Sequence, residues 1–332
     1  MTTIKLFGVR PEDRPFIDEW KTKHNVEIEE TPEILNDDNV DTVQGFDGVS
    51  ISQQIPLSET VFQKLHEFGI KQLAQRSAGY DFLDLDLARK YDIIITNVPS
   101  YSPRSIAEYT VMQALNLVRK TSAIQTKTAN YDFRWEPSIM SRSIQDLTVA
   151  VIGTGRIGSQ VAVIFAKGFN ARVVGYDLEP DDALSEFVEY QSSLEEVVRD
   201  ADIVTVHVPG SADNHYLFND EVFKAFKEGA YFINCARGSV VETQALLAHL
   251  DSGHIAGAAL DTYEGEKGLF PSDQRGTELE DDTLVHLIER SDVLVSPHIA
   301  FYTDAAVKNL IVDALDAILQ VIQTGDTPFR VN

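Results

Sequence analysis

Short apolar runs alternate with amphipathic stretches through the first hundred residues of the chain. The apolar runs have the length of strands, and the amphipathic stretches space their apolar residues as helices do. We expect strands at residues 4–9, 26–29, 48–52, 71–76 and 93–97, and helices at 12–24, 58–68 and 84–91. This alternation predicts a parallel sheet covered by helices on both faces.

The rest of the chain repeats the alternation after a segment that contains Pro99 and Pro103. One long helix is expected at 105–128, and a capping box that begins at Ser193 predicts a short helix at 194–199. Strands are expected at 148–152, 172–176, 203–208, 231–234, 258–260 and 293–295, and a last long helix at 303–323. The segment 264–282 is irregular and polar, which is typical of a surface loop.

The first strand of this second region ends in the motif Gly153-Thr154-Gly155-Arg156-Ile157-Gly158. Its first glycine permits a tight turn, its second lets the backbone approach a pyrophosphate, and its third lets the helix lie close to the sheet. Asp177 ends the following strand, where a carboxylate can accept both ribose hydroxyls of NAD and repel the 2′-phosphate of NADP. Strand, glycine turn, helix, strand and acid together predict an NAD site.

These patterns define an α/β protein with two doubly wound parallel-sheet domains. We predict a Rossmann NAD-binding domain at 101–299, inserted in a flavodoxin-like substrate (catalytic) domain made of 1–100 and 300–332. The first domain has no glycine fingerprint of its own. Two chain crossings would leave a cleft between the domains.

Composition narrows the possible partners. The chain has 332 residues, 43% of them hydrophobic, and a formal net charge of −24, which disfavours nucleic acid and anionic membranes. Anionic ligands therefore need local positive potential. No apolar run approaches the roughly 20 residues that span a bilayer. The single cysteine, Cys235, excludes an internal disulfide and fits a cytoplasmic location. No metal site is expected, because the histidines lack paired ligand spacing.

Charged residues follow three further strands, where ligands bind in a parallel α/β sheet. Arg237 follows one strand, Glu264 and Glu266 follow another, and His298 follows the last. An arginine can hold a carboxylate through two hydrogen bonds, and a histidine beside a carboxylate can exchange a proton with a substrate oxygen. Together with a nicotinamide, these groups are the parts of a 2-hydroxyacid dehydrogenase.

The chain resembles the D-isomer-specific 2-hydroxyacid dehydrogenases, and among them most closely the bacterial D-lactate dehydrogenases. A mid-chain fingerprint distinguishes this family from the L-lactate and malate dehydrogenases. The matching stretches cover nearly the whole chain: Asn97-Val98-Pro99-Ser100-Tyr101-Ser102-Pro103, the fingerprint, His207-Val208-Pro209, Ala236-Arg237-Gly238, Asp261-Thr262-Tyr263-Glu264-Gly265-Glu266 and Pro297-His298-Ile299-Ala300-Phe301-Tyr302-Thr303.

The resemblance implies roles for individual residues. Arg237 would grip the substrate carboxylate and keto oxygen, His298 would be the acid/base, and Glu266 rather than Glu264 would pair with His298. Cofactor contacts are expected from Gly153, Gly155, Arg156, Ile157, Gly158, Asp177, Val208, Pro209, Asn214, Cys235, Ala236 and Asp261. Substrate contacts are expected from Ser77, Ala78, Gly79, Tyr101, Arg237, Phe301 and Tyr302.

Two positions depart from the family pattern. Ser77-Ala78-Gly79 stands where many relatives carry Asn-Val-Gly, so a hydroxyl replaces a side-chain amide in the loop expected to receive the substrate carboxylate. Asn170 stands where a glycine is common before the second strand of the dinucleotide motif. Asparagine tolerates a left-handed backbone, so we expect the turn to be kept.

The expected reaction is reversible hydride transfer between NADH and pyruvate that yields D-lactate. An alternative is a D-2-hydroxyisocaproate-type dehydrogenase that acts on bulkier 2-keto acids. A less favoured alternative is an NADH-sensing scaffold of the corepressor type, which would not need Arg237, Glu266 and His298 together. The resemblance and the apolar surface of the 105–128 helix also imply a homodimer.

Overall fold

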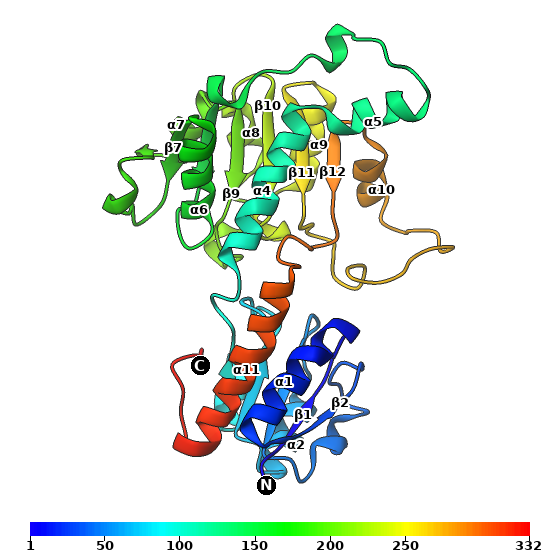
Figure 1. The fold of residues 1–332 in the computed structure, drawn as a ribbon, viewed down its shortest axis with the longest axis vertical. Coiled ribbons are helices and arrows are strands. Elements are labelled where there is room, and N and C mark those ends of the chain that lie inside the picture. Colours follow the sequence, from blue (N-terminus) through cyan, green and yellow to red (C-terminus); the bar gives the residue numbers. More distant parts are fainter. The chain divides into compact units, whose positions relative to one another are not determined.

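The chain divides into two compact units. In the computed structural model, which describes residues 1–332, unit 1 comprises Met1–Ser102 and Tyr302–Asn332, and unit 2 comprises Pro103–Phe301 (Figure 1). Each chain crossing lies two residues beyond the position expected from the sequence. Which ligand each unit binds stays a prediction at this point.

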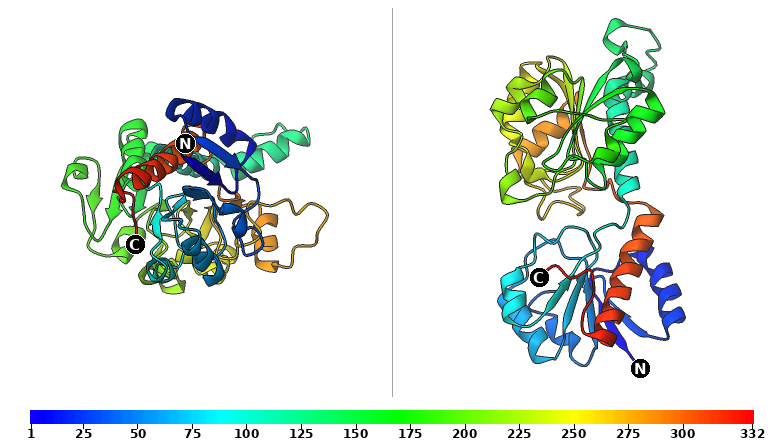
Figure 2. Two further views of the ribbon diagram at one scale, coloured as in Figure 1. Left: turned by 90° about the horizontal axis from the view of Figure 1, so that it is seen from below. Right: turned by 90° about the vertical axis from the view of Figure 1, so that its left-hand side faces the viewer.

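Unit 1 is a five-stranded parallel sheet with helices on both faces (Figure 2). Its strands are arranged in the order β2-β1-β3-β4-β5, the flavodoxin-like order. They are β1 (Thr3–Leu6), β2 (Glu27–Glu30), β3 (Gly48–Ile51), β4 (Gln72–Gln75) and β5 (Ile94–Thr96). The covering helices are α1 (Arg14–His24), α2 (Glu59–Glu67), α3 (Leu85–Lys90) and α11 (Asp304–Thr324).

Unit 2 is a seven-stranded parallel sheet in the order β12-β11-β10-β9-β6-β7-β8. The strands are β6 (Thr148–Ile152), β7 (Arg172–Tyr176), β8 (Glu189–Tyr190), β9 (Ile203–Val206), β10 (Ala230–Asn234), β11 (Ile255–Leu260) and β12 (Val293–Val295). The helices are α4 (Pro103–Val118), α5 (Thr121–Ala129), α6 (Gly158–Val163), α7 (Leu194–Arg199), α8 (Asp220–Ala225), α9 (Thr243–Asp251) and α10 (Asp282–Glu289). The predicted α/β class with two doubly wound sheets is confirmed.

Each sheet reverses its strand order at one point. In unit 2 the reversal lies between β6 and β9, and in unit 1 it lies between β1 and β3. The loops that follow such a pair of strands diverge to opposite faces of the sheet, which opens a crevice where ligands bind in doubly wound folds. In unit 2 this position coincides with the glycine motif.

Two local predictions need correction. The helix expected at 105–128 is broken between α4 and α5, where Lys120 adopts a left-handed backbone (φ 53°). Thr121 turns back there and donates to the Asn116 side chain at 3.0 Å. The break separates α4, which buries much of its surface, from α5, which buries none of its residues.

The expected capping box is only half formed. Ser193 accepts from the backbone N–H of Glu196 at 3.2 Å, as predicted. The Glu196 carboxylate, however, accepts from the backbone and hydroxyl of Ser192 instead of from the backbone of Ser193. Asn170, in contrast, has the predicted left-handed backbone, with φ of 53°.

No helix of the structure is long and apolar enough to cross a lipid bilayer. The main core of unit 2 fills the space around Phe218, Phe223 and Phe232, which are completely buried. In unit 1 the corresponding cluster contains Phe62 and Leu65 of α2 against Leu73 of β4. These packed layers hold the loops at the carboxyl ends of the strands.

Candidate active site

The glycine motif after β6 has three glycines with three different environments. Gly153 has φ of 85°, and a side chain there would also lie 2.8 Å from the carbonyl oxygen of His207. A Cβ at Gly158 would approach the carbonyl oxygen of Gly153 to 1.8 Å, so α6 packs directly on the turn. A Cβ at Gly155 would meet no protein atom within 4 Å. The first and third glycines are therefore required by the protein itself, whereas the second leaves a backbone face that fits a pyrophosphate.

Asp177 lies at the end of β7, beside this turn. Its Oδ2 accepts from the Thr154 backbone N–H at 2.6 Å and from the Thr154 hydroxyl at 3.1 Å. Its Oδ1 accepts from the Glu179 N–H at 3.0 Å. A half-buried carboxylate held in this way, next to a glycine turn, fits the ribose of NAD. Val208, which follows β9 on the other side of β6, has its Cγ1 3.1 Å from a Cβ built on Gly153.

The expected adenosine-side residues after β9 form one compact loop. Asn214 closes it by donating from Nδ2 to the carbonyl oxygen of Pro209 at 3.0 Å. Gly210 lies in this loop, and a Cβ there would come within 2.9 Å of the Arg237 side chain. The loop after β9 therefore makes room for the stem of Arg237.

Arg237 lies in the loop after β10, and buried Asn234 shapes that loop. Asn234 donates to the carbonyl oxygen of Arg237 and accepts from the Ala236 N–H, both at 2.9 Å. Gly238 then packs so tightly that a Cβ would lie 2.1 Å from the Tyr263 backbone. The sequence pattern suggested no role for Asn234, and it marked Gly238 only as part of a stretch that matches the family. A polar residue that ends an apolar strand is the signal that points to Asn234.

Cys235 is buried in the same loop. Burial, the first cause, and the nearby Asp261 carboxylate raise the pKa of its thiol to about 12, so the thiol stays protonated at neutral pH. A protonated, buried thiol is a poor nucleophile. The side chain of Cys235 is therefore buried in the protein interior. The part of this residue that could contact a cofactor is its backbone.

The structure brings His298 and Glu266 together. His298 Nδ1 lies 2.8 Å from Glu266 Oε1, and the other carboxylate oxygen accepts from the Tyr263 N–H at 3.0 Å. Both side chains are half-buried. This pairing holds the imidazole ring in one orientation and leaves its Nε2 for a reacting group.

Glu264 has a different environment from Glu266. One oxygen of Glu264 accepts from the Thr243 N–H at the start of α9, and the other accepts from the Tyr216 hydroxyl at 2.7 Å. Glu264 therefore cross-links loops and helix α9, and of these two glutamates it is Glu266 that contacts His298.

Asp261 anchors the turn that carries His298. Its buried carboxylate accepts from the Ser296 hydroxyl at 2.6 Å and from the backbone N–H groups of Ile299 and Ala300 at 2.9 and 2.8 Å. The N–H of His298 donates to the Asp261 carbonyl oxygen at 2.7 Å. These bonds keep His298 in a left-handed conformation with φ of 54°, which costs a non-glycine residue energy. The sequence did not suggest this anchoring contact; the predicted cofactor contact of Asp261 stays a prediction.

In unit 1, the loop that contains Ser77, Ala78 and Gly79 follows β4. The Ser77 hydroxyl donates to the carbonyl oxygen of Gly79 and accepts from Gln75 at 2.9 Å. Asn97 donates to the carbonyl oxygen of Ala78 at 2.7 Å. The hydroxyl that replaces the family's amide therefore closes the loop through its own backbone.

The expected aromatic substrate residues are divided between the units. Phe301 ends unit 2, and Tyr101 and Tyr302 belong to unit 1. Asn309 of α11 donates to the Tyr101 carbonyl oxygen at 2.7 Å. The Tyr302 hydroxyl donates to Glu12, and the Arg10 guanidinium lies 5.3 Å from its ring centre.

A Rossmann sheet with a glycine turn, an acid at the end of the next strand and a histidine–carboxylate pair is typical of a nicotinamide-dependent oxidoreductase. The profile of the D-isomer specific 2-hydroxyacid dehydrogenase, NAD binding domain, matches residues 111–300. The chain is 45% identical over 332 residues, all of both chains, to a protein of Staphylococcus epidermidis named D-lactate dehydrogenase.

Two solved structures are similar over nearly their whole length. A D-lactate dehydrogenase from Treponema pallidum superposes with a TM-score of 0.92 at 36% identity and covers all of both chains. A D-2-hydroxyisocaproate dehydrogenase also has a TM-score of 0.92, at 34% identity and with 99% of each chain covered. The chain belongs to the D-isomer-specific 2-hydroxyacid dehydrogenases. It is an NAD-dependent oxidoreductase, which confirms the enzyme and cofactor predictions over the scaffold alternative.

Proposed function

We propose that the protein reduces pyruvate to D-lactate with NADH, and catalyses the reverse oxidation. The observation that carries this proposal is the 2.8 Å contact between His298, in the loop after β12, and Glu266, in the loop after β11, with Arg237 after β10 in the same sheet. The full-length likeness to a named D-lactate dehydrogenase supports the substrate class.

Cofactor binding is assigned to the loops after β6, β7, β9, β10 and β11. NADH, when bound, supplies the hydride that reduces the keto carbon. Gly155 and the start of α6 would receive the pyrophosphate, and Asp177 would accept from the adenosine ribose. Further contacts are proposed for Gly153, Arg156, Ile157, Gly158, Val208, Pro209, Asn214, Cys235, Ala236 and Asp261.

Proton transfer is assigned to His298. Its Nδ1 faces the Glu266 carboxylate, so Nε2 would donate to the developing alkoxide oxygen during reduction and accept the hydroxyl proton during oxidation. Glu266 would hold the ring in place and stabilise the imidazolium. Reduction therefore needs the protonated ring and oxidation the neutral ring.

Substrate orientation is assigned to Arg237. Its guanidinium would bind the carboxylate and polarise the keto oxygen, which positions the carbon for attack. Ser77, Ala78 and Gly79 of unit 1 would offer backbone N–H groups to the carboxylate. Tyr101, Phe301 and Tyr302 would border the substrate side chain.

The competing assignment is a D-2-hydroxyisocaproate-type dehydrogenase, favoured by the equal TM-score of that structure. Initial rates of NADH oxidation with pyruvate, 2-ketoisocaproate and phenylpyruvate separate the two, followed by chiral analysis of the product. We expect the highest kcat/KM with pyruvate and a D product. A higher value with 2-ketoisocaproate supports the alternative, and an L product contradicts the family chemistry.

We also propose a homodimer, and one exposed segment supports it. Residues 130–140, here called the arm, follow α5 and expose Tyr131, Phe133, Trp135 and Met140, with Trp135 96% exposed. Large aromatic side chains this exposed are typical of a surface that another protein covers.

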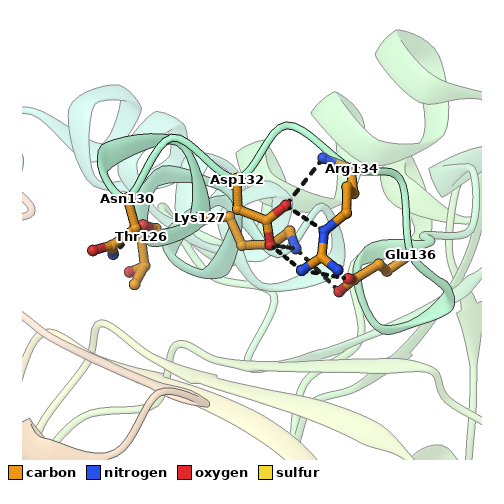
Figure 3. Close-up of polar contacts among 6 residues, drawn as sticks. All are labelled: Thr126, Lys127, Asn130, Asp132, Arg134 and Glu136. Carbon is orange, nitrogen blue, oxygen red and sulfur yellow. Dashed lines mark hydrogen bonds and ion pairs between the residues drawn. The ribbon is translucent and has the colours of Figure 1, made fainter.

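An ion-pair network gives the arm a defined conformation (Figure 3). Lys127 binds Asp132 at 2.6 Å and Glu136 at 3.0 Å, and Arg134 binds Asp132 at 2.8 Å and Glu136 at 3.3 Å. The hydrogen bonds from Arg134 and Lys127 hold the pKa of Asp132 far below its usual range. Asp132, Arg134 and Glu136 are therefore held by ion pairs, while Phe133 and Trp135 between them are exposed. We propose that these aromatic residues contact a second copy of the chain.

The dimer is tested by replacing Phe133 and Trp135 with serine and measuring mass in solution by light scattering. We expect the unaltered protein to be a dimer and the double variant a monomer. Ile288→Ser, at a 53% exposed residue of α10, serves as the control and should stay dimeric. A dimeric double variant would overturn the proposed interface.

A cytoplasmic location is proposed on the state of the only cysteine. Cys235 is free and buried, so no disulfide stabilises the chain, as is usual for proteins of a reducing compartment. Fractionation of the source cells should recover the NADH-dependent activity with the cytoplasmic proteins. Recovery in the membrane or external fraction would contradict the proposal.

A further inference from the structure

A chain of hydrogen bonds ends on Asp177 and begins on a strand outside the glycine motif. Tyr190, on the edge strand β8, places its hydroxyl 2.9 Å from the Thr154 hydroxyl. The Thr154 hydroxyl lies 3.1 Å from Asp177 Oδ2. The Asp181 N–H lies 3.3 Å from the Tyr190 hydroxyl. The edge strand β8 is thus connected to the Asp177 carboxylate through Thr154.

The direction of each bond follows from counting hydrogens. The Asp177 carboxylate has none to give, so the Thr154 hydroxyl must donate its single hydrogen to it. Thr154 can then only accept from Tyr190, and Tyr190 in turn accepts from the Asp181 N–H. Each hydroxyl donates once and accepts once, so the chain runs in one direction and ends at the carboxylate.

The residues around the Tyr190–Thr154 contact leave no room for a side chain at position 175. Gly175 of β7 pairs with Tyr190, and a Cβ at Gly175 would lie 2.5 Å from Val188, 3.4 Å from the Tyr190 ring and 3.5 Å from Thr154. A side chain at position 175 would therefore collide with Val188, whereas a hydrogen leaves Tyr190 and Thr154 close to the β7 backbone. Thr154 itself is buried, so water cannot readily replace the Tyr190 hydroxyl as its donor.

We propose that Tyr190 is a positioning residue for cofactor selection. Through Thr154 it holds the Asp177 carboxylate at the place where it accepts from the ribose and repels a 2′-phosphate. Through the Asp181 N–H it also ties down the loop that follows Asp177. This inference rests on the proposed cofactor role of Asp177 and adds a residue that acts through Thr154.

The first test is Tyr190→Phe, which removes one hydroxyl. We expect the dissociation constant of NADH to rise roughly three- to tenfold, as the loss of one neutral hydrogen bond allows. The NADPH dissociation constant should stay unchanged or fall, so the preference for NADH over NADPH decreases by at least the same factor. The kcat with saturating NADH and pyruvate should stay within about twofold, because nothing at His298 changes.

Controls separate positioning from a general loss of structure. Tyr91→Phe removes a tyrosine hydroxyl that donates to a carboxylate, Glu59, in unit 1, and should leave both dissociation constants unchanged. A Tyr190→Phe variant that loses thermal stability but keeps the NADH/NADPH preference would overturn the proposal.

A double-mutant cycle tests the route through Thr154. Thr154→Val should weaken NADH binding, and adding Tyr190→Phe to it should have little further effect, because the relay is already broken. Thr154→Ser keeps the hydroxyl and should restore near-normal binding. Additive effects of the two substitutions would show that Tyr190 acts by another route.

Asp177→Asn, measured in the same titrations, distinguishes failure of the inference from failure of the proposed cofactor role. If Asp177→Asn weakens NADH binding roughly tenfold and Tyr190→Phe does not, only the relay is wrong. If Asp177→Asn itself leaves the NADH/NADPH preference unchanged, the proposed cofactor role of Asp177 fails, and the relay fails with it.

Discussion

The two units have similar parallel sheets, but the turns at the point where the strand order reverses are packed differently. In unit 2 the turn after β6 is lined by glycines, and a Cβ at Gly155 would contact nothing. In unit 1 the space beside the turn after β1 is occupied by the Arg76 side chain. Arg76 donates to the carbonyl oxygens of Phe7 and Gly8 at 2.6 and 3.1 Å and to the Ser50 hydroxyl at 2.9 Å.

The difference shows that the strand order creates a possible ligand-binding position in both units. The side chains at that position decide whether a ligand can bind there. Burial lowers the pKa of the Arg76 guanidinium to about 10, with Asp13 opposing the shift, so it remains charged at neutral pH. A buried charge satisfied by backbone oxygens leaves no backbone face for a ligand there. The remaining site of interest in unit 1 is the loop after β4, which contains Ser77.

The largest effect is expected at His298, which tests whether proton transfer belongs to unit 2. His298→Gln should lower kcat roughly 10²- to 10⁴-fold while the NADH dissociation constant stays the same. His66→Gln in unit 1 and His286→Gln on α10 are controls that should keep full turnover. If the His298→Gln variant turned over near the normal rate, the assignment of His298 as the acid/base would be wrong.

Two glycine substitutions sharpen the contrast within the turn after β6. Gly158→Ala places a Cβ 1.8 Å from the Gly153 carbonyl oxygen, so we expect a loss of about 3 kcal/mol in unfolding free energy. Gly155→Ala meets no protein atom and should keep its stability but bind NADH at least tenfold more weakly, roughly the factor given by about 1.4 kcal/mol. Urea unfolding and NADH titration measure the two properties. Equal loss of stability in both variants would contradict the distinction.

Arg76→Met tests the packed turn of unit 1. Three acceptors lose their donor, and we expect the unfolding free energy to fall by about 3 kcal/mol. NADH affinity should not change, because the dinucleotide residues belong to unit 2. Arg14→Met removes an exposed arginine that pairs with Glu30 and should change stability by less than about 0.5 kcal/mol. Weaker NADH binding by the Arg76→Met variant would contradict the assignment of the dinucleotide site to unit 2 alone.

The smallest effect is expected at Ser50, whose hydroxyl accepts from Arg76 and donates to the Ala74 carbonyl oxygen at 3.1 Å. Ser50→Ala should cost about 1 kcal/mol in unfolding free energy. In the Arg76→Met background the cost should be smaller, since one of the two partners is already gone. A fully additive double variant would show that Ser50 and Arg76 act independently.

Much of this architecture follows from local signals in the sequence. Apolar runs of strand length marked eleven of the twelve strands and missed only β8, which has two residues and too little apolar surface to register. The break between α4 and α5 was missed because helical periodicity continues across it, and only the left-handed Lys120 reveals it. Strand ends pointed to Arg237, to the pair Glu264 and Glu266, and to His298, since charged residues a few positions after an apolar run are visible without coordinates. The choice of Glu266 over Glu264 came from the family resemblance.

The amino-acid order alone determined the α/β class, the glycine turn and its acid, because these depend on periodicity and on backbone freedom at single residues. Tertiary structure decided which neighbours each polar group acquired. It bound Asp261 to the backbone around His298, gave Glu264 its contacts with Thr243 and Tyr216, and connected Tyr190 to Asp177 through Thr154. Such contacts join residues far apart in the chain, and hydrogen-bond geometry selects them only after the sheet has formed.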